Sequence, residues 1–221
     1  MSEMVTAEVS RLLDTLADFV AEIDSDCSSI HNGVELGLVN VKPEYQDVAY
    51  EQTGRKLSEE QLIAWRLVDK LRRVRYSVEW EVPYPALSGK RCDLVIRLND
   101  CSRLWIELKL AWKSWFNCEG PPVYSNRSYR SYLEGRNRTY SFRHDFDKLG
   151  DLSWSGTDYR AVCLVGFDCA DRPMDGEINA VVQTIWDQGR AWEKVIERSW
   201  RDRRCGDFQI NVHSWVLPPA G

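Results

Sequence analysis

Histidine is scarce in this chain, and cysteine does not occur in the paired spacing that binds zinc. The 221 residues include three His and seven Cys, with no Cys-x-x-Cys motif and no two His within four residues of each other. A zinc site is therefore not expected. Because the number of Cys is odd and three of them lie in or beside apolar runs, we expect reduced thiols and a cytoplasmic protein.

Long apolar runs are also missing. No stretch approaches the length needed to cross a bilayer, so we expect no membrane segment. The N-terminus has no basic start followed by an apolar run, so we expect no signal peptide. Without a repeat or a long linker, residues 1–221 are expected to form a single domain.

Positive charge is not in excess, because the formal net charge is −5. This balance argues against a protein that coats nucleic acid without specificity. It does not exclude an enzyme whose positive charge is concentrated in one cleft. Ten Trp and nine Tyr in a chain of this size indicate a well-filled core or aromatic contact surfaces.

Two short apolar runs carry charged residues, at 92–96 and 105–110. Strand alternation predicts that Asp93 shares a face with Val95, and that Cys92, Leu94 and Ile96 share the opposite face. It also predicts that Glu107 shares a face with Lys109. If the runs pair, two carboxylates and one ammonium meet beside apolar side chains. Such charges are costly to bury unless they are paired or hold a metal. The alternative is a solvated strand edge with a weak ion pair.

The order Asp93, thirteen residues, then Glu107-Leu108-Lys109 resembles the D-x(n)-[DE]-x-K signature of the PD-(D/E)XK nuclease superfamily. Cys92 stands where the motif's name has Pro, a position that varies in the superfamily. The resemblance implies a restriction-endonuclease-like fold, an α/β domain with an αβββαβ core and a central mixed sheet flanked by helices. This core would span residues 58–168, with residues 1–57 and 169–221 as extensions packed on it.

The patterns along the chain fit that order of elements. We predict helices at 58–73 and 142–149 and strands at 75–83 and 159–167, besides the two charged runs. Outside this core we predict helices at 4–23 and 176–200, a strand at 208–217, and short strands or irregular structure at 25–57. The run at 159–167 is apolar almost throughout, which is typical of an interior strand covered on both faces.

The residue types suit metal-dependent cleavage of phosphodiesters. Mg²⁺ prefers oxygen ligands and keeps several waters, and Mn²⁺ is a possible substitute. Asp93 and Glu107 would supply carboxylate oxygens, and the backbone carbonyl of Leu108 a third ligand. Lys109 would orient the attacking water and stabilise the charge that develops on phosphorus.

Many members of the superfamily add a Glu from the helix before the first strand, and Glu59 and Glu60 are both candidates. Glu60 lies on the apolar stripe that should face the sheet, so it is favoured as the fourth catalytic residue. The alternative is that both acids only mark a helix start, with Ser58 as N-cap and Gln61 as its capping-box partner.

An arginine- and tyrosine-rich segment follows the second charged run, and we predict that it contacts nucleic acid. The proposed contacts are Arg127, Arg130, Arg136, Arg138 and Arg143. The alternative is a surface insertion whose arginines pair with the protein's acids. In the helix that follows, Asp145 and Asp147 are expected to be solvated.

The resemblance implies a Mg²⁺-dependent nuclease that hydrolyses phosphodiester bonds of DNA and acts as an endonuclease. Two alternatives stay open: a catalytically silent protein on the same fold that binds nucleic acid or a partner, and a nuclease directed at RNA. A homodimer is compatible with cleavage of both strands.

Overall fold

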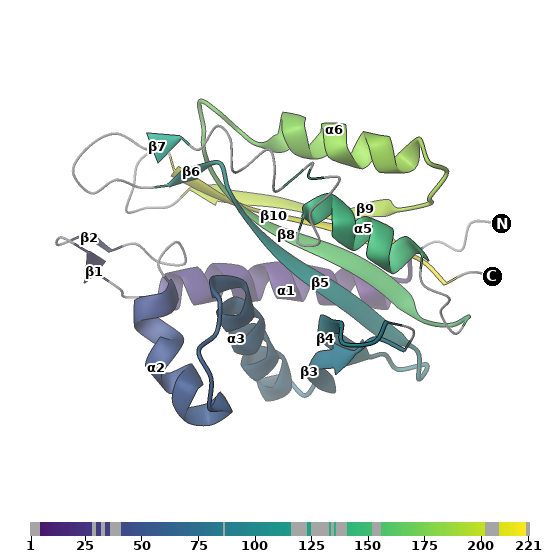
Figure 1. Ribbon diagram of the computed structural model, residues 1–221, viewed down its shortest axis with the longest axis horizontal. Coiled ribbons are helices and arrows are strands. Elements are labelled where there is room, and N and C mark those ends of the chain that lie inside the picture. Colours follow the sequence, from purple (N-terminus) through teal and green to yellow (C-terminus); the bar gives the residue numbers. More distant parts are fainter. Residues whose placement is uncertain are drawn as a thin grey trace.

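Six strands form one mixed sheet, and helices cover both of its faces (Figure 1). The strand order is β3-β4-β5-β8-β10-β9, and only β5 and β8 pair in parallel. The strands are β3 (Val78–Pro83), β4 (Arg91–Arg97), β5 (Arg103–Trp112), β8 (Tyr159–Cys169), β9 (Glu193–Arg201) and β10 (Phe208–Leu217). The predicted class, an α/β fold with a central mixed sheet flanked by helices, is confirmed.

This computed structural model describes residues 5–27, 30–31, 34–35, 41–85, 87–115, 123–124, 133, 135, 141–151, 156–201 and 208–219. Two further two-stranded sheets pair β1 (Ile30–His31) with β2 (Val34–Glu35) and β6 (Ser114–Trp115) with β7 (Val123–Tyr124). In these ranges no helix combines the length and the apolar character that a bilayer span requires.

Two apolar layers hold the helices on the sheet. One layer packs α1 (Ala7–Asp26) and α3 (Glu59–Arg73) on one face, with α2 (Val41–Thr53) beside α3. The other packs α5 (Phe142–Asp151) and α6 (Asp175–Trp186) on the opposite face. β8 lies between the layers and is buried along its whole length, as its apolar sequence predicts.

The start of α3 is fixed by local chemistry. The Ser58 hydroxyl accepts a hydrogen bond from the Gln61 N–H, and the Gln61 side chain accepts one from the Ser58 N–H. This capping box satisfies two backbone donors at the helix start. Leu62, Ile63 and Leu67 then pack into the core. The predicted helix start is confirmed, and Glu60 lies in its first turn.

The predicted helix at 176–200 is wrong over its second half. α6 ends at Trp186, and Gly189 adopts a φ of 78°, a conformation that favours glycine. Residues 193–201 form the edge strand β9, which pairs with β10. The spacing of Trp192, Val195 and Ile196 also suits a helix, but pairing with β10 decides the structure.

Residues 25–57 contain more helix than the sequence indicates. The expected mixture of short strands and irregular structure holds for β1 and β2, whereas α2 occupies Val41–Thr53. Pro43 is the third residue of α2. Proline is tolerated in the first turn because an N–H there has no partner within the helix.

Candidate functional site

The strands β4 and β5 separate where the predicted acidic residues lie. Their paired residues run from Leu94 and Ile106 to Arg97 and Arg103. Beyond Ile106, β5 continues in register with β8 on its other side. At the point of separation the Leu108 N–H donates a hydrogen bond of 2.8 Å to Asp93 Oδ2. A carboxylate thus takes the place of a strand carbonyl, which fixes Asp93 at the edge of β5.

The backbone is irregular at this point, and one predicted face is wrong. We expected Cys92 to lie on the same face as Leu94, but Leu94 packs in the α1–α3 layer and Cys92 in the α5–α6 layer with Val95. On β3, Glu81 lies between the partners of Leu94 and Cys92 and has a φ of 50°. Irregular backbone of this kind interrupts the alternation of faces.

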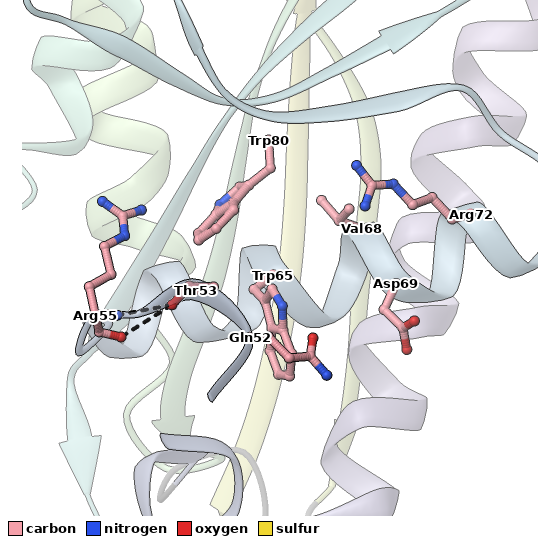
Figure 2. A pocket seen from close by; sticks show the side chains of 8 residues that line it. All are labelled: Gln52, Thr53, Arg55, Trp65, Val68, Asp69, Arg72 and Trp80. Carbon is pink, nitrogen blue, oxygen red and sulfur yellow. Dashed lines mark hydrogen bonds between the residues drawn. The ribbon is translucent and has the colours of Figure 1, made fainter. Parts of the chain in front are cut away.

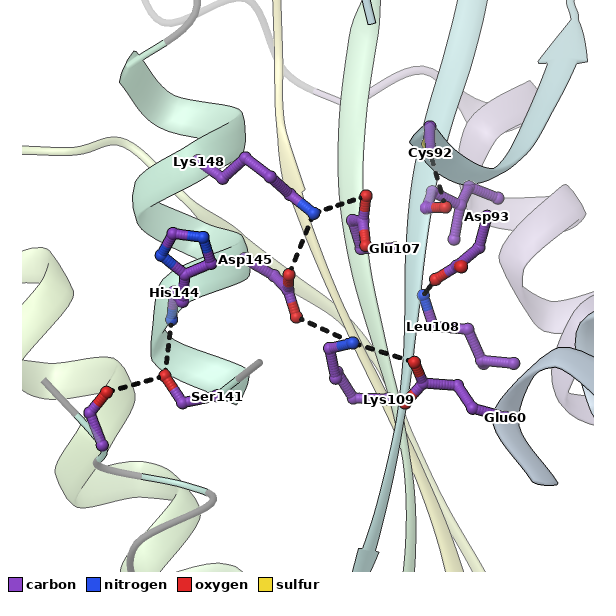
Figure 3. A network of polar contacts seen from close by, with 12 residues as sticks. Glu60, Cys92, Asp93, Glu107, Leu108, Lys109, Ser141, His144, Asp145 and Lys148 are labelled. Atoms are coloured by element: carbon purple, nitrogen blue, oxygen red, sulfur yellow. Dashed lines mark hydrogen bonds and ion pairs between the residues drawn. The ribbon is translucent and has the colours of Figure 1, made fainter. Parts of the chain in front are cut away.

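Lys109 connects the two sides of the sheet (Figure 3). Its Nζ lies 2.9 Å from Glu60 Oε1 on α3 and 3.5 Å from Asp145 Oδ2 on α5. The acid of α3 can reach the lysine because the paired part of β4 ends before this point. Of the two candidates on α3, the structure therefore brings Glu60 to Lys109.

Sequence reasoning missed three residues that surround Glu107. Lys148 Nζ lies 2.7 Å from Glu107 Oε1 and 3.1 Å from Asp145 Oδ1. The buried Tyr84 hydroxyl donates a hydrogen bond to Glu107 Oε1. Asp145 is buried rather than solvated, so that expectation is wrong. A signal existed, because Asp145 is three residues after Phe142, and α5 buries that face.

We call the four acids the carboxylate cluster; they are Glu60, Asp93, Glu107 and Asp145. Two lysines, Lys109 and Lys148, contact this cluster. With every group ionised, four negative and two positive charges leave an excess of two negative charges in a largely buried place. Partial protonation or a divalent cation would compensate that excess.

This environment raises the pKa of two acids of the carboxylate cluster. Desolvation, followed by repulsion from Glu107, raises the pKa of Asp93 well above its ordinary value. Desolvation, followed by repulsion from Asp145, raises the pKa of Glu107. Asp145 Oδ2 is buried without a hydrogen-bond partner, and Lys109 faces it at the longer ion-pair distance of 3.5 Å. The cluster is therefore short of positive charge.

The donor set fits Mg²⁺. Asp93, Glu107 and the Leu108 carbonyl offer only oxygen, and the charge excess matches a divalent ion. Lys148 would have to leave Glu107 for the carboxylate to turn to a cation. Among the described residues, only one group of three or more potential ligands has its donor atoms within 4.8 Å of one another. That group lies outside the carboxylate cluster. A cation in the carboxylate cluster would therefore keep several waters.

The predicted nucleic-acid contacts divide into two sets. Arg127, Arg130, Arg136 and Arg138 lie outside the described residues. Arg143 belongs to α5, where its guanidinium donates a hydrogen bond of 3.2 Å to Thr184 Oγ1 and lies 3.7 Å from Asp147 Oδ2. Its described contacts join α5 to α6, and a role in binding nucleic acid stays a prediction.

A pocket of about 460 Å³ lies between the end of α2, α3 and β3 (Figure 2). Its lining residues are Gln52, Thr53, Arg55, Trp65, Val68, Asp69, Arg72 and Trp80. The guanidinium of Arg55 lies over the Trp80 ring at 5.2 Å from its centre. None of the predicted site residues lines this pocket, so it is separate from the carboxylate cluster.

Comparison with known proteins leaves the function open. No family model and no curated protein matches the chain. A solved structure entitled "Crystal structure of SSO0001" aligns with 83% of this chain and 87% of its own, at 16% sequence identity. The TM-score of 0.22 is too low for this likeness to carry an argument.

Proposed function

We propose that the protein is a Mg²⁺-dependent nuclease that hydrolyses phosphodiester bonds of DNA. The observation that carries the proposal is the position of Lys109, between Glu60 of α3 and a buried acid of α5 and beside the point where β4 and β5 separate. Four acids and two lysines leave an excess of negative charge in a largely buried place, and a divalent cation would compensate it. A solvated strand edge has no such requirement, because water screens its charges.

We also propose that residues 58–168 form a restriction-endonuclease-like core. Apart from the separate β6–β7 pair between β5 and α5, the order α3-β3-β4-β5-α5-β8 agrees with the αβββαβ order implied by the D-x(n)-[DE]-x-K resemblance. The parallel pairing of β5 with β8 across α5 gives that order one continuous sheet.

Each residue has a distinct task in this mechanism. Asp93, Glu107 and the Leu108 carbonyl would hold Mg²⁺. The bound ion would supply Lewis acidity to the scissile phosphate and lower the pKa of a water. Lys109 orients the water and stabilises negative charge developing on phosphorus. Glu60 positions Lys109 through the 2.9 Å ion pair.

One observation favours the alternative of a catalytically silent binding protein. Glu107 accepts a hydrogen bond from Tyr84 and pairs with Lys148, so protein groups already satisfy one predicted metal ligand. In that reading Lys148 replaces the cation permanently. Calorimetric titration with Mg²⁺ and Mn²⁺ separates the two, because the nuclease binds metal in the parent and weakly or not at all in Asp93→Asn.

Cleavage of plasmid and linear DNA with Mg²⁺ or Mn²⁺ tests the proposal directly. We expect Asp93→Ala and Lys109→Ala to lose activity by about 10²–10³ or more. Glu79→Gln is a matched control, because Glu79 is an exposed acid on β3. If both alanine variants cut as well as the parent, the assignment is wrong. Parallel assays on single-stranded DNA, duplex RNA and single-stranded RNA decide whether DNA or RNA is the substrate.

A further inference from the structure

A second group of potential ligands lies on the face of the sheet that α5 and α6 cover, away from the carboxylate cluster. His213 of β10 pairs across the sheet with Leu164 of β8 on one side and with Glu197 of β9 on the other. Leu164 in turn pairs with Lys109 of β5. One whole strand thus separates His213 from Lys109. Asp175, the first residue of α6, completes the group.

The two acids approach the ring of His213 at different nitrogens. His213 Nε2 lies 3.5 Å from Asp175 Oδ1, and Nδ1 lies 4.0 Å from Glu197 Oε1. One donor atom from each residue lies within 4.8 Å of the other two. Metal bonds of about 2.0–2.2 Å place neighbouring ligand atoms roughly 3.0–3.5 Å apart. A single ion takes one ring nitrogen, so the acid that faces the other nitrogen must turn toward the ion to reach that spacing.

The buried ring of His213 has polar atoms that a bound ligand would satisfy. Its side chain is only 2% exposed, and both ring nitrogens are buried without a hydrogen-bond partner. A buried polar group without a partner destabilises the folded state, so its retention needs an explanation. The ring is held by stacking on Trp215, with 5.8 Å between centroids and 18° between planes. This stacking fixes the imidazole with Nε2 toward Asp175 and Nδ1 toward Glu197.

We propose that His213, Asp175 and Glu197 bind a divalent transition-metal ion, with Zn²⁺ the best match. One imidazole nitrogen and two carboxylate oxygens are ligands that Zn²⁺ accepts, whereas Mg²⁺ takes oxygen almost alone. The two carboxylates attract the ion, and Lys194 offsets part of their charge. Asp175 and Glu197 are 48% and 55% exposed, so water completes the coordination.

The charged groups that face His213 are Asp175, Glu197 and Lys194. The neutral imidazole is the form that binds metal. Lys194 takes Glu197 Oε2 at 2.8 Å, whereas Oε1 is the oxygen that faces His213.

The ion would tie the start of α6 to the edge pair β9–β10. Met174, the residue before Asp175, is already anchored, since its N–H donates to the buried Asp168 Oδ2 at 2.6 Å. A metal at Asp175 would extend this anchor to the two outermost strands. The site therefore stabilises the fold and takes no part in the proposed cleavage.

Zn²⁺ titration of the whole protein by calorimetry, with thermal denaturation, tests this proposal. We expect one Zn²⁺ per chain, a rise in melting temperature with Zn²⁺, and at least a tenfold loss of affinity in Asp175→Asn and Glu197→Gln. Both residues are largely exposed, so these variants should fold even if His213→Gln does not. Asp187→Asn makes the same charge change at the other end of α6 and should bind as the parent does.

Cysteine could bind Zn²⁺ on its own, so a second readout assigns the ligands. We expect Co²⁺ to bind without a thiolate charge-transfer band and to shift the ring signals of His213 but not those of His144 on α5. Unchanged Zn²⁺ affinity in both acid variants, or a thiolate band, would overturn the site. DNA cleavage is not a readout here, so failure of the nuclease proposal leaves the result intact.

Discussion

Lys148 Nζ lies 2.7 Å from Glu107 Oε1, with both side chains almost fully buried. The lysine also contacts Asp145, so it sits between two acids of the carboxylate cluster. Burial alone would lower the pKa of Lys148, but attraction to Asp145 and Glu107 outweighs burial and raises it. Lys148 is therefore a built-in cation, and a metal on Glu107 must compete with it.

Removing that cation should make the fold depend on Mg²⁺. Lys148→Met leaves Glu107 and Asp145 buried without their partner, a change that costs about 3–5 kcal/mol in comparable cases. We expect Mg²⁺ to restore more stability to this variant than to the parent, as measured by thermal denaturation with and without the ion. Lys113→Met is the control, because Lys113 pairs with Glu177 outside the cluster. Equal Mg²⁺ responses in parent and Lys148→Met would show that the lysine and the metal do not compete.

A pH-dependent contribution is expected from Asp168, at the end of β8. Burial raises the pKa of this carboxyl to about 6. Its ordinary value is about 3.9, so the folded state holds the proton more tightly and stability falls as pH rises from about 4 to above 6. Asp168→Asn removes this effect. We compare the free energy of unfolding of Asp168→Asn with that of the parent at each pH. The difference, variant minus parent, should increase by up to about 3 kcal/mol from pH 4 to pH 8.

Urea denaturation at the two pH values measures that difference. Asp187→Asn, an exposed acid after α6, controls for the loss of one negative charge. A difference between Asp168→Asn and the parent that does not change with pH would contradict the raised pKa.

Local signals predicted the parts of the fold that local chemistry decides. The Ser58–Gln61 capping box lies within four residues, and the interior position of β8 follows from its own apolar run. The strand at 193–201 was missed because its conformation depends on β10, which comes later in the chain. Apolar spacing alone does not distinguish a helix from an edge strand when the deciding hydrogen bonds come from elsewhere.

The candidate site shows the same division. Asp93, Glu107 and Lys109 were found because they lie in two neighbouring runs with a recognisable order. Lys148 and Tyr84 contact Glu107 only after α5 and the end of β3 fold over β5. No spacing rule links such residues. His213 and its two acids come from three separate elements and carry no motif at all.

The capping box of α3 should influence activity through Glu60. Ser58→Ala removes the acceptor for the Gln61 N–H and should cost about 0.5–2 kcal/mol of stability. Since Glu60 is in the same turn, fraying there should also weaken its ion pair with Lys109 and lower the cleavage rate several-fold. Ser58→Asp keeps an acceptor and should restore both stability and rate. Restored stability with an unrestored rate would mean that the cap does not position Glu60.

A tight contact beside the proposed zinc site should be sensitive to a single methyl group. A Cβ at Gly166 of β8 would lie 2.3 Å from the sulfur of Met174. Met174 is fully buried, so its side chain has no open solvent to move into. We expect Gly166→Ala to destabilise the protein by about 1–3 kcal/mol, as measured by urea denaturation.

Shortening the opposing side chain should relieve that clash. Met174→Ala alone leaves a cavity and costs about 2–5 kcal/mol, but it also removes the atoms that meet the new methyl group. The double variant should therefore be more stable than the sum of the single changes implies, by about 0.5–3 kcal/mol. Strict additivity would mean that the methyl group is accommodated by movement of β8 rather than of Met174. Because Met174 precedes Asp175, Gly166→Ala should also weaken Zn²⁺ binding, and that loss should be reversed in the double variant.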